Sequence, residues 1–373
     1  MRARALNILV PRCVDADARN AQNLNARALL SRFESPNILW HSFHFHAPDP
    51  AVTGRKNVRS HQLIRGGLWP YHAQLKYQGQ FDGIFYPGNE CFDARALKWR
   101  AWLRRRIPVV ATLEGVPGDE TREKALTAKL GRPVHCFRPR TGPGWTICHD
   151  SVHDCADQHI AISPYLKRIG ECLYGGRFSV LPLGIDASIF NSSGRHAKPS
   201  VPVVVGAGTL YEAKRPQVFI KLAAEFPSAK VVWYGDGPLR KKLITEAQQR
   251  NLENLSFPGA LPPHALASRF RECSMLVLPS HSEGVPKVSQ EAASCGLPVV
   301  LFGFYEAPSV IDGLNGYVVW SDAELFKRVD ELIASPGKCA EMGKCGADMA
   351  LEWSWDRVAT LWEAAVLGSI ETQ

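Results

Sequence analysis

The chain has 373 residues, of which 45% are hydrophobic and 21% charged, so we expect two folded domains of ordinary size and not a disordered chain. No stretch reaches the roughly 18 consecutive apolar residues of a membrane-spanning helix, and no signal-like apolar block stands at the N-terminus. We therefore expect a cytoplasmic protein. The ten cysteines are scattered without paired spacing, which favours reduced, buried thiols over a disulfide framework.

The net charge of +8 is unevenly distributed. Residues 1–190 hold 26 Lys and Arg against 16 Asp and Glu, whereas residues 191–373 hold 18 against 20. A basic half favours an anionic membrane surface, a nucleic acid or an acidic substrate as partner. Trp99 and Trp102, on a helix predicted over 93–106, suit a membrane interface, with a solvated helix and a buried tryptophan face as the alternative. Nucleic acid is disfavoured because the sequence contains no recognition motif.

Strands and helices alternate through the first half of the chain. Apolar runs predict buried strands over 5–10, 37–45, 82–87, 108–112, 157–163 and 178–181. A helix is predicted over 21–31, and Ser163-Pro164 predicts the start of another by its cap and first-turn proline. Residues 47–78 are predicted to form a long loop with one helical piece, and 115–150 show no clear pattern. The alternation is typical of a doubly wound parallel sheet.

The same alternation starts again after a polar segment, 191–200, which we interpret as a linker. Strands are predicted over 201–205, 230–234, 255–257, 275–278 and from 299, and helices over 216–226, 238–249, 264–271, 287–294, 321–335, 338–350 and 355–368. The predicted fold class is therefore α/β, with two doubly wound, Rossmann-like parallel-sheet domains that face a cleft. They are expected to span 1–190 and 191–352, and 353–373 to form a C-terminal helix that returns to the first domain.

The most informative stretch follows the strand predicted over 275–278. Glu283 lies in a loop with a glycine and a proline, and Glu291 lies eight residues later on a short helix, so both carboxylates can face the crevice above the strand ends. The start of that helix offers unpaired N–H groups, and Lys287 adds a cation, which suits a diphosphate. Two carboxylates beside it would accept hydrogen bonds from sugar hydroxyls. The alternative is an ordinary strand, loop and helix with solvated acids.

A second group of candidates lies in the loop after the strand predicted over 201–205. Lys214 and Arg215 suit phosphate contact, with a solvated surface pair as the alternative. Gly206-x-Gly208 is only a weak dinucleotide signal, because Tyr211 stands where a third glycine should fall.

Other polar residues give weaker signals. Glu114 lies just past a strand end in a Gly/Pro-rich loop, where active-site residues are common, although a helix cap or a solvated acid fits as well. His44 and His46 would share a strand face, and His149 and His153 have helical metal spacing. Neither pair is completed by further ligands, so no metal site is predicted.

The order of these motifs resembles the family 4 retaining glycosyltransferases of the GT-B fold. The resemblance covers residues 160–370 well and is much weaker over 1–150. It rests on Gly208-x-Leu210-x3-Lys214-Arg215, Glu283-x7-Glu291, Ser163-x-Tyr165-Leu166, Leu183-Gly-Ile-Asp186-x3-Phe190, Gly235-Asp-Gly-Pro-Leu239, Pro279-Ser280-x2-Glu283-Gly284, Gly296-Leu-Pro-Val299 and Asn315-Gly316.

The resemblance implies transfer of a sugar from a nucleotide diphosphate sugar, with retention at the anomeric carbon and no cofactor. It implies that Lys214 binds the donor diphosphate, that Glu283 accepts from sugar hydroxyls and that Glu291 accepts from the ribose. The backbone that would meet phosphate and sugar is that of Gly284, Val285, Pro286, Lys287 and Val288.

The chain departs from the family pattern at three positions. Thr209 stands where the family commonly has Arg, so Arg215 is the candidate substitute for that phosphate cation. Leu183 replaces an Asn at the hinge turn. Glu114 corresponds to a His near the donor sugar, which makes it a candidate catalytic residue beside Glu283 and Lys214.

The expected function is that of a hexosyltransferase with a UDP- or GDP-linked donor. Its acceptor, a glycan, a lipid-linked or a small molecule, would contact the basic first domain. A nucleotide-sugar epimerase of the same fold and a non-catalytic sugar-nucleotide binder are the alternatives. A location at the inner face of an anionic membrane stays open, and no nucleic acid partner is expected.

Overall fold

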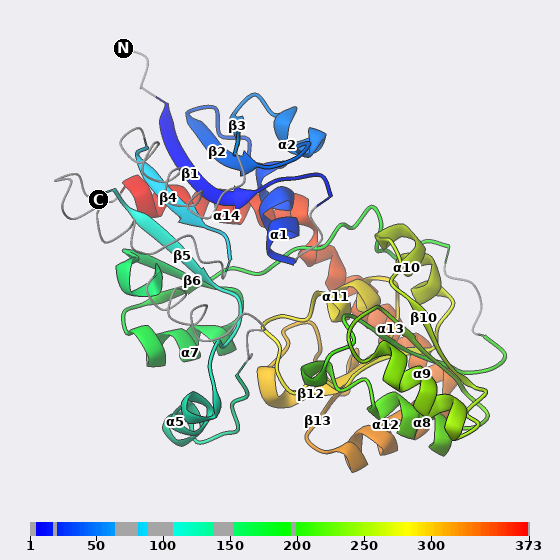
Figure 1. Ribbon diagram of the computed structural model, residues 1–373. Coiled ribbons are helices and arrows are strands. Elements are labelled where there is room, and N and C mark those ends of the chain that lie inside the picture. Colours follow the sequence, from blue (N-terminus) through cyan, green and yellow to red (C-terminus); the bar gives the residue numbers. More distant parts are fainter. Residues whose placement is uncertain are drawn as a thin grey trace. The chain divides into compact units, whose positions relative to one another are not determined.

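The computed structural model describes residues 5–17, 21–63, 81–88, 107–136, 152–194 and 199–371 (Figure 1). Two compact units divide them. The first comprises the described residues up to Gly131, from Cys136 to Leu183 and from Trp355 onward, and the second comprises Arg132–His135 and Gly184–Ser354. The helix predicted over 93–106, with Trp99 and Trp102, lies outside the described residues, as do His149 and positions 195–198 of the interpreted linker.

The first unit contains a parallel sheet with seven strands among the described residues, in the order β3-β2-β1-β4-β5-β6-β7. The strands are β1 Leu6–Cys13, β2 Ile38–His44, β3 Val58–Gln62, β4 Gly83–Tyr86, β5 Val109–Leu113, β6 Gln158–Ala161 and β7 Phe178–Val180. All of the strands predicted for this half are confirmed. The prediction of a loop over 47–78 is wrong at β3, because this edge strand buries Val58 alone and lacks an apolar pattern.

Helices of the first unit begin and end at recognisable signals. They are α1 Ala21–Leu30, α2 Pro50–Thr53, α5 Glu120–Leu130, α7 Pro164–Tyr174 and α14 Trp355–Glu371. Ser163 caps α7 as predicted, since its hydroxyl accepts from the N–H of Leu166 at 3.2 Å. In α14, Trp362 Nε1 donates to the carbonyl of Pro182 at 2.7 Å, and the Glu363 carboxylate accepts from two main-chain N–H groups. The C-terminal helix therefore packs into the first unit.

The second unit contains a parallel sheet with six strands within its described part, in the order β10-β9-β8-β11-β12-β13. Its strands are β8 Val203–Ala207, β9 Lys230–Tyr234, β10 Leu255–Gly259, β11 Met275–Leu278, β12 Val299–Phe302 and β13 Gly316–Val319. Its helices are α8 Val218–Glu225, α9 Arg240–Gln249, α10 Pro263–Arg271, α11 Lys287–Ser294, α12 Asp322–Ala334 and α13 Pro336–Ala350, with 3-10 turns η2 Glu212–Lys214, η3 Gly303–Tyr305 and η4 Leu351–Trp353. The predicted class of two doubly wound parallel sheets is confirmed.

The strand order of the second sheet reverses between β8 and β11. From β8 the chain proceeds through β9 to β10 on one side, and from β11 through β12 to β13 on the other. Loops that leave such a pair of strands diverge and leave a crevice at the carboxyl edge, where open α/β sheets bind ligands. Among the described residues, no helix combines the length and the apolar composition that crossing a bilayer requires.

Close backbone packing fixes the position of α11, which begins at the carboxyl edge. An added Cβ at Gly343, on α13, would lie 1.9 Å from the carbonyl oxygen of Gly296, just after α11. We expect Gly343→Ala to lower the free energy of unfolding by about 1–3 kcal/mol, because backbone must move to admit the methyl group. The measurement is urea denaturation of the purified protein.

Gly337→Ala, on the same helix, is the matched control. A Cβ at Gly337 meets open space, so this change should leave stability equal or raise it by up to about 1 kcal/mol. Equal midpoints for the two variants would contradict the packing described for Gly343.

Candidate functional site

The loops after β8 and β11 bring together two residues of opposite charge. Lys214 ends the 3-10 turn η2, and Glu283 lies in the loop between β11 and α11. The Lys214 ammonium forms an ion pair with the Glu283 carboxylate, and only 15% and 10% of the two side chains are exposed. Burial opposes the charge of Lys214, but the Glu283 carboxylate and Tyr211 raise the pKa of Lys214 above its ordinary value. The Lys214 ammonium is therefore held charged in a largely buried position.

Glycines allow the loop after β8 to approach its neighbour closely. Gly208 and Gly235 have positive φ angles of 133° and 153°, and a Cβ at Gly235 would lie 1.9 Å from the Gly208 carbonyl oxygen. The N–H of Leu210 donates to the carbonyl of Asp236 at 3.0 Å. Residues 208–210 are thus held against the loop that follows β9. Thr209 is exposed in this arrangement, and the chain continues from here to Lys214.

Arg215 has a different environment from Lys214. Its guanidinium donates two hydrogen bonds to the Asp322 carboxylate, both of 2.8 Å, and lies 5.3 Å from the centroid of the Phe302 ring. Its main chain is left-handed, with φ of 51°. A bidentate pair with a stacked ring restrains the guanidinium strongly, so Arg215 is held by the protein itself.

The remaining donor-side candidates lie at the start of α11. Pro286 is the N-cap, and no side chain caps the helix at this end. Gly284, Val285 and Val288 are partly exposed beside it. The first turn of α11 can therefore bind an anion through its main-chain N–H groups.

Glu291 lies one helical turn after Lys287 on α11. Burial raises the pKa of the Glu291 carboxyl above its ordinary value, and the positive charge of Lys287 acts in the opposite direction. A partly desolvated carboxylate is a strong acceptor for a ligand hydroxyl, because few waters compete for it.

Glu114 belongs to the first unit, whereas the other candidates belong to the second. It directly follows β5, and its Oε1 accepts a hydrogen bond of 3.0 Å from Nδ2 of the buried Asn25 on α1. The amide orients this carboxylate at the carboxyl edge of the first sheet.

Sequence reasoning missed three features around Glu283. Asp322 holds Arg215, and Tyr305 ends the 3-10 turn η3 after β12. The segment Arg132–His135 packs within the second unit: Ser282, which precedes Glu283, donates to the His135 carbonyl at 2.8 Å. None of them had a recognisable motif. An aromatic residue in a Gly-Phe-Tyr turn is typical of a core, and an ion pair between distant residues leaves no local pattern.

The histidines considered as metal ligands have other partners. His44 Nδ1 lies 2.7 Å from the Ser60 hydroxyl, and the His153 ring stacks on Tyr174 with centroids 4.5 Å apart. Within the described ranges, no group of three or more His, Cys, Asp or Glu side chains could hold a metal ion.

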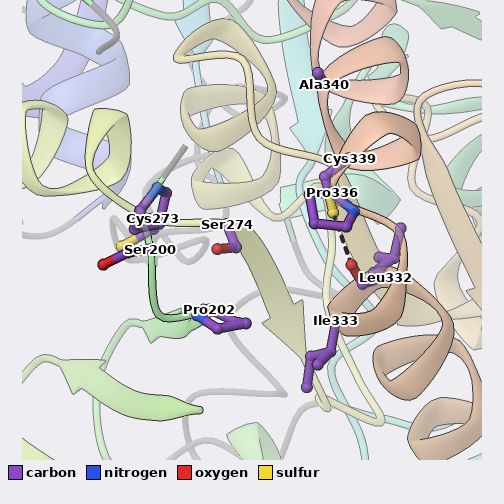
Figure 2. Close-up of a pocket in the computed structure, with 10 residues that line it drawn as sticks. Ser200, Pro202, Cys273, Ser274, Leu332, Ile333, Pro336, Cys339 and Ala340 are labelled. Carbon is purple, nitrogen blue, oxygen red and sulfur yellow. Dashed lines mark hydrogen bonds between the residues drawn. The ribbon is translucent and has the colours of Figure 1, made fainter. Parts of the chain in front are cut away.

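Figure 2 shows a cavity of about 100 Å³ in the second unit. Its walls come from the segments that precede β8 and β11 and from α12 and α13: Pro199, Ser200, Pro202, Cys273, Ser274, Leu332, Ile333, Pro336, Cys339 and Ala340. Cys339 Sγ donates to the carbonyl of Leu332 at 3.2 Å. This cavity lies at the amino ends of the strands, so it is separate from Lys214 and Glu283, which follow the carboxyl ends of β8 and β11.

Comparison with known sequences identifies the second unit. The family described as glycosyl transferases group 1 matches residues 189–349. Residues of the chain are 29% identical over 202 positions to the D-inositol 3-phosphate glycosyltransferase of Segniliparus rotundus, covering 49% of the chain and 45% of that protein. They are 27% identical over 168 positions to the alpha-galactosylglucosyldiacylglycerol synthase of Streptococcus pneumoniae, covering 43% and 44%. The chain spans about half the length of these curated relatives.

Comparison with solved structures extends over nearly the whole chain. The sucrose-phosphate synthase of Thermosynechococcus elongatus matches with a TM-score of 0.80 and 16% identity, covering 99% of this chain and 100% of that one. HepE of Anabaena, solved with UDP, matches with a TM-score of 0.70 and 18% identity, covering 98% and 100%. The likeness at this identity concerns the fold. Residues 189–349 therefore match the glycosyl transferases group 1 family, and the two parallel-sheet units have the GT-B glycosyltransferase fold.

Proposed function

We propose that this protein is a retaining glycosyltransferase that moves a hexose-type sugar from a UDP- or GDP-linked donor to an acceptor hydroxyl. The observation that carries the proposal is the Lys214–Glu283 ion pair, beside the uncapped start of α11 at the strand reversal. It supplies a cation, main-chain N–H groups and a carboxylate at one edge of the sheet. A sugar diphosphate needs this combination, since its phosphates need positive charge and its hydroxyls need acceptors.

In the proposed complex, the donor separates the two charges of the pair. The diphosphate takes the Lys214 ammonium and the main-chain N–H groups of Gly284, Val285, Lys287 and Val288, before and at the start of α11. Glu283 then accepts from the sugar hydroxyls and Glu291 from the ribose hydroxyls. Each charged group of the empty site thereby exchanges a protein partner for a ligand partner, and no charge is left buried without compensation.

The reaction breaks the bond between the anomeric carbon and the diphosphate oxygen and forms a bond from that carbon to the acceptor oxygen. We propose attack from the face that the diphosphate leaves, which retains the anomeric configuration. The acceptor proton passes to the departing phosphate oxygen. Lys214 and the N–H groups of α11 stabilise the charge that develops on the leaving group, and so lower the barrier to its departure.

The first unit is proposed to supply the acceptor side. Glu114, oriented by Asn25, is the candidate catalytic carboxylate of this unit. The positive balance of residues 1–190 supports an acceptor with negative charge or one presented at an anionic membrane surface. A diacylglycerol-linked sugar in the name of one relative and UDP-glucose bound to a structural neighbour agree with such a reaction.

A donor panel tests the proposed activity. Incubation with UDP- and GDP-linked hexoses and a pool of glycan, lipid-linked and small acceptors should release one nucleoside diphosphate. The product, examined by proton NMR, should keep the anomeric configuration of the donor sugar. Absence of nucleotide release with every donor, with and without acceptor, would overturn the proposal.

Glu291→Gln should raise the donor KM about 10-fold or more while changing kcat less, because a hydrogen bond from the ribose to a carboxylate acts in the ground state and the transition state alike. Steady-state kinetics with the active donor measures both parameters. Glu246→Gln is the control, since Glu246 pairs with Arg250 on the surface of α9. The ribose role would be wrong if the two variants had the same KM.

Membrane association is tested separately. If the basic half meets an anionic surface, co-sedimentation with vesicles should require anionic lipid and should fall as salt is raised from 50 to 300 mM, a change of roughly the size that screens surface charge. Equal binding to neutral vesicles would remove the proposed attraction.

A further inference from the structure

Tyr305 ends the turn η3, which follows β12, and β12 is the neighbour of the strand that leads to Glu283. Leu278 of β11 pairs with Leu301 of β12, so the segments that follow these two strands leave the sheet at the same edge. The Tyr305 side chain is 1% exposed. Its hydroxyl donates to no acceptor among the described residues. A buried hydroxyl without an acceptor is unusual, because the water that it gave up is not replaced.

The position of this hydroxyl is fixed by its turn. Arg132 Nη2 donates to the carbonyl of Gly303, the first residue of η3, at 3.0 Å, and the same guanidinium pairs with Glu306, directly after the turn. The guanidinium also lies 5.8 Å from the centroid of the Trp320 ring. Two contacts of one guanidinium therefore hold η3 from both ends, and the third places the guanidinium over Trp320.

The loop that carries Glu283 is attached to the same segment. Ser282 donates to the His135 carbonyl at 2.8 Å, and the His135 ring stacks on His281 with centroids 5.2 Å apart. The Arg132–His135 segment thus fixes η3 and the Glu283 loop together. Burial, and next the Glu283 carboxylate, raise the pKa of Tyr305 well above its ordinary value. A main-chain hydrogen bond with Phe302 acts in the opposite direction, but the pKa stays raised. The hydroxyl therefore keeps its proton and can act as a hydrogen-bond donor.

We propose that Tyr305 is a positioning residue, whose hydroxyl donates a hydrogen bond to the Glu283 carboxylate once the donor diphosphate has drawn Lys214 away. This inference rests on the proposed transferase function, in which Lys214 and Glu283 part. In the empty site the carboxylate is satisfied by Lys214, and the phenol has no acceptor. In the complex the phenol replaces the ammonium and keeps Glu283 ionised and oriented toward the sugar hydroxyls.

Tyr305→Phe separates this role from a purely structural one. In the empty protein the change removes a hydroxyl that has no acceptor, so the melting temperature should stay equal or rise. In turnover it removes a donor to a carboxylate, so kcat should fall about 10- to 100-fold. The acid limb of the pH profile of kcat should move to higher pH, because a carboxylate that loses a donor is protonated more easily.

Tyr317→Phe is the matched control in the same unit. Tyr317, on β13, is 3% exposed, and its hydroxyl donates to Glu331 Oε1 at 2.5 Å. Loss of this satisfied hydroxyl should lower the melting temperature and leave kcat and its pH profile unchanged. Tyr305→Phe should therefore lower kcat without lowering the melting temperature, whereas Tyr317→Phe should lower the melting temperature without lowering kcat.

The outcomes distinguish the two levels of the proposal. If the wild-type protein released no nucleotide from any of the tested donors, the transferase function would be contradicted. An active wild type whose Tyr305→Phe variant has the same kcat and the same acid limb would overturn the inference while leaving the function in place. A variant that loses activity only in proportion to a lowered melting temperature would overturn it as well, since a structural role predicts that correlation.

Discussion

The site depends on an ion pair that is largely removed from water. Lys214 and Glu283 are 69 positions apart in the chain, and each would carry an uncompensated charge without the other. Burying two charges costs free energy, which their mutual attraction offsets only while they stay together or while other partners replace them. A ligand therefore separates the pair most readily if it offers an anion to the lysine and hydrogen-bond donors to the carboxylate. A sugar diphosphate offers both, whereas phosphate alone and a neutral sugar alone each satisfy one side.

The residues around Lys214 and Glu283 are held in place by contacts of their own. Arg215, next to Lys214 in sequence, donates two hydrogen bonds to Asp322 and lies over the Phe302 ring. The Arg215 side chain is therefore restrained by other partners than the Lys214 side chain. Glycines at 208 and 235 allow the backbone contact that presents this loop, and Arg132 holds the turn on the other side of Glu283. With its neighbours restrained, the ion pair is the element that we propose changes partners when a sugar donor enters. The phenol of Tyr305 is then the proposed hydrogen-bond donor to Glu283.

The sequence predicted the architecture better than the connections within the site. Apolar runs marked most strands of both sheets, because buried parallel strands are apolar over most of their length, but β13 was not predicted. The strand β3 was missed because an edge strand with one buried residue has no such run, and α5 was missed because Leu126 is its only buried residue among those described. Lys214 and Glu283 were each found by their loops, but their pairing follows from the strand order, which no local pattern contains. Tyr305 and Arg132 act through tertiary contacts alone and gave no sequence signal.

The claim that Lys214 is paired with Glu283 when no ligand is bound can be tested without any turnover. Calorimetry should compare the wild type with Glu283→Gln for binding of the nucleoside diphosphate, UDP or GDP, that the wild type prefers. This ligand carries the diphosphate but has no transferable sugar for Glu283 to contact. We predict tighter binding by the variant, because Lys214 no longer has to leave a carboxylate to reach the phosphates. Equal or weaker binding by Glu283→Gln would show that the ion pair does not oppose diphosphate binding.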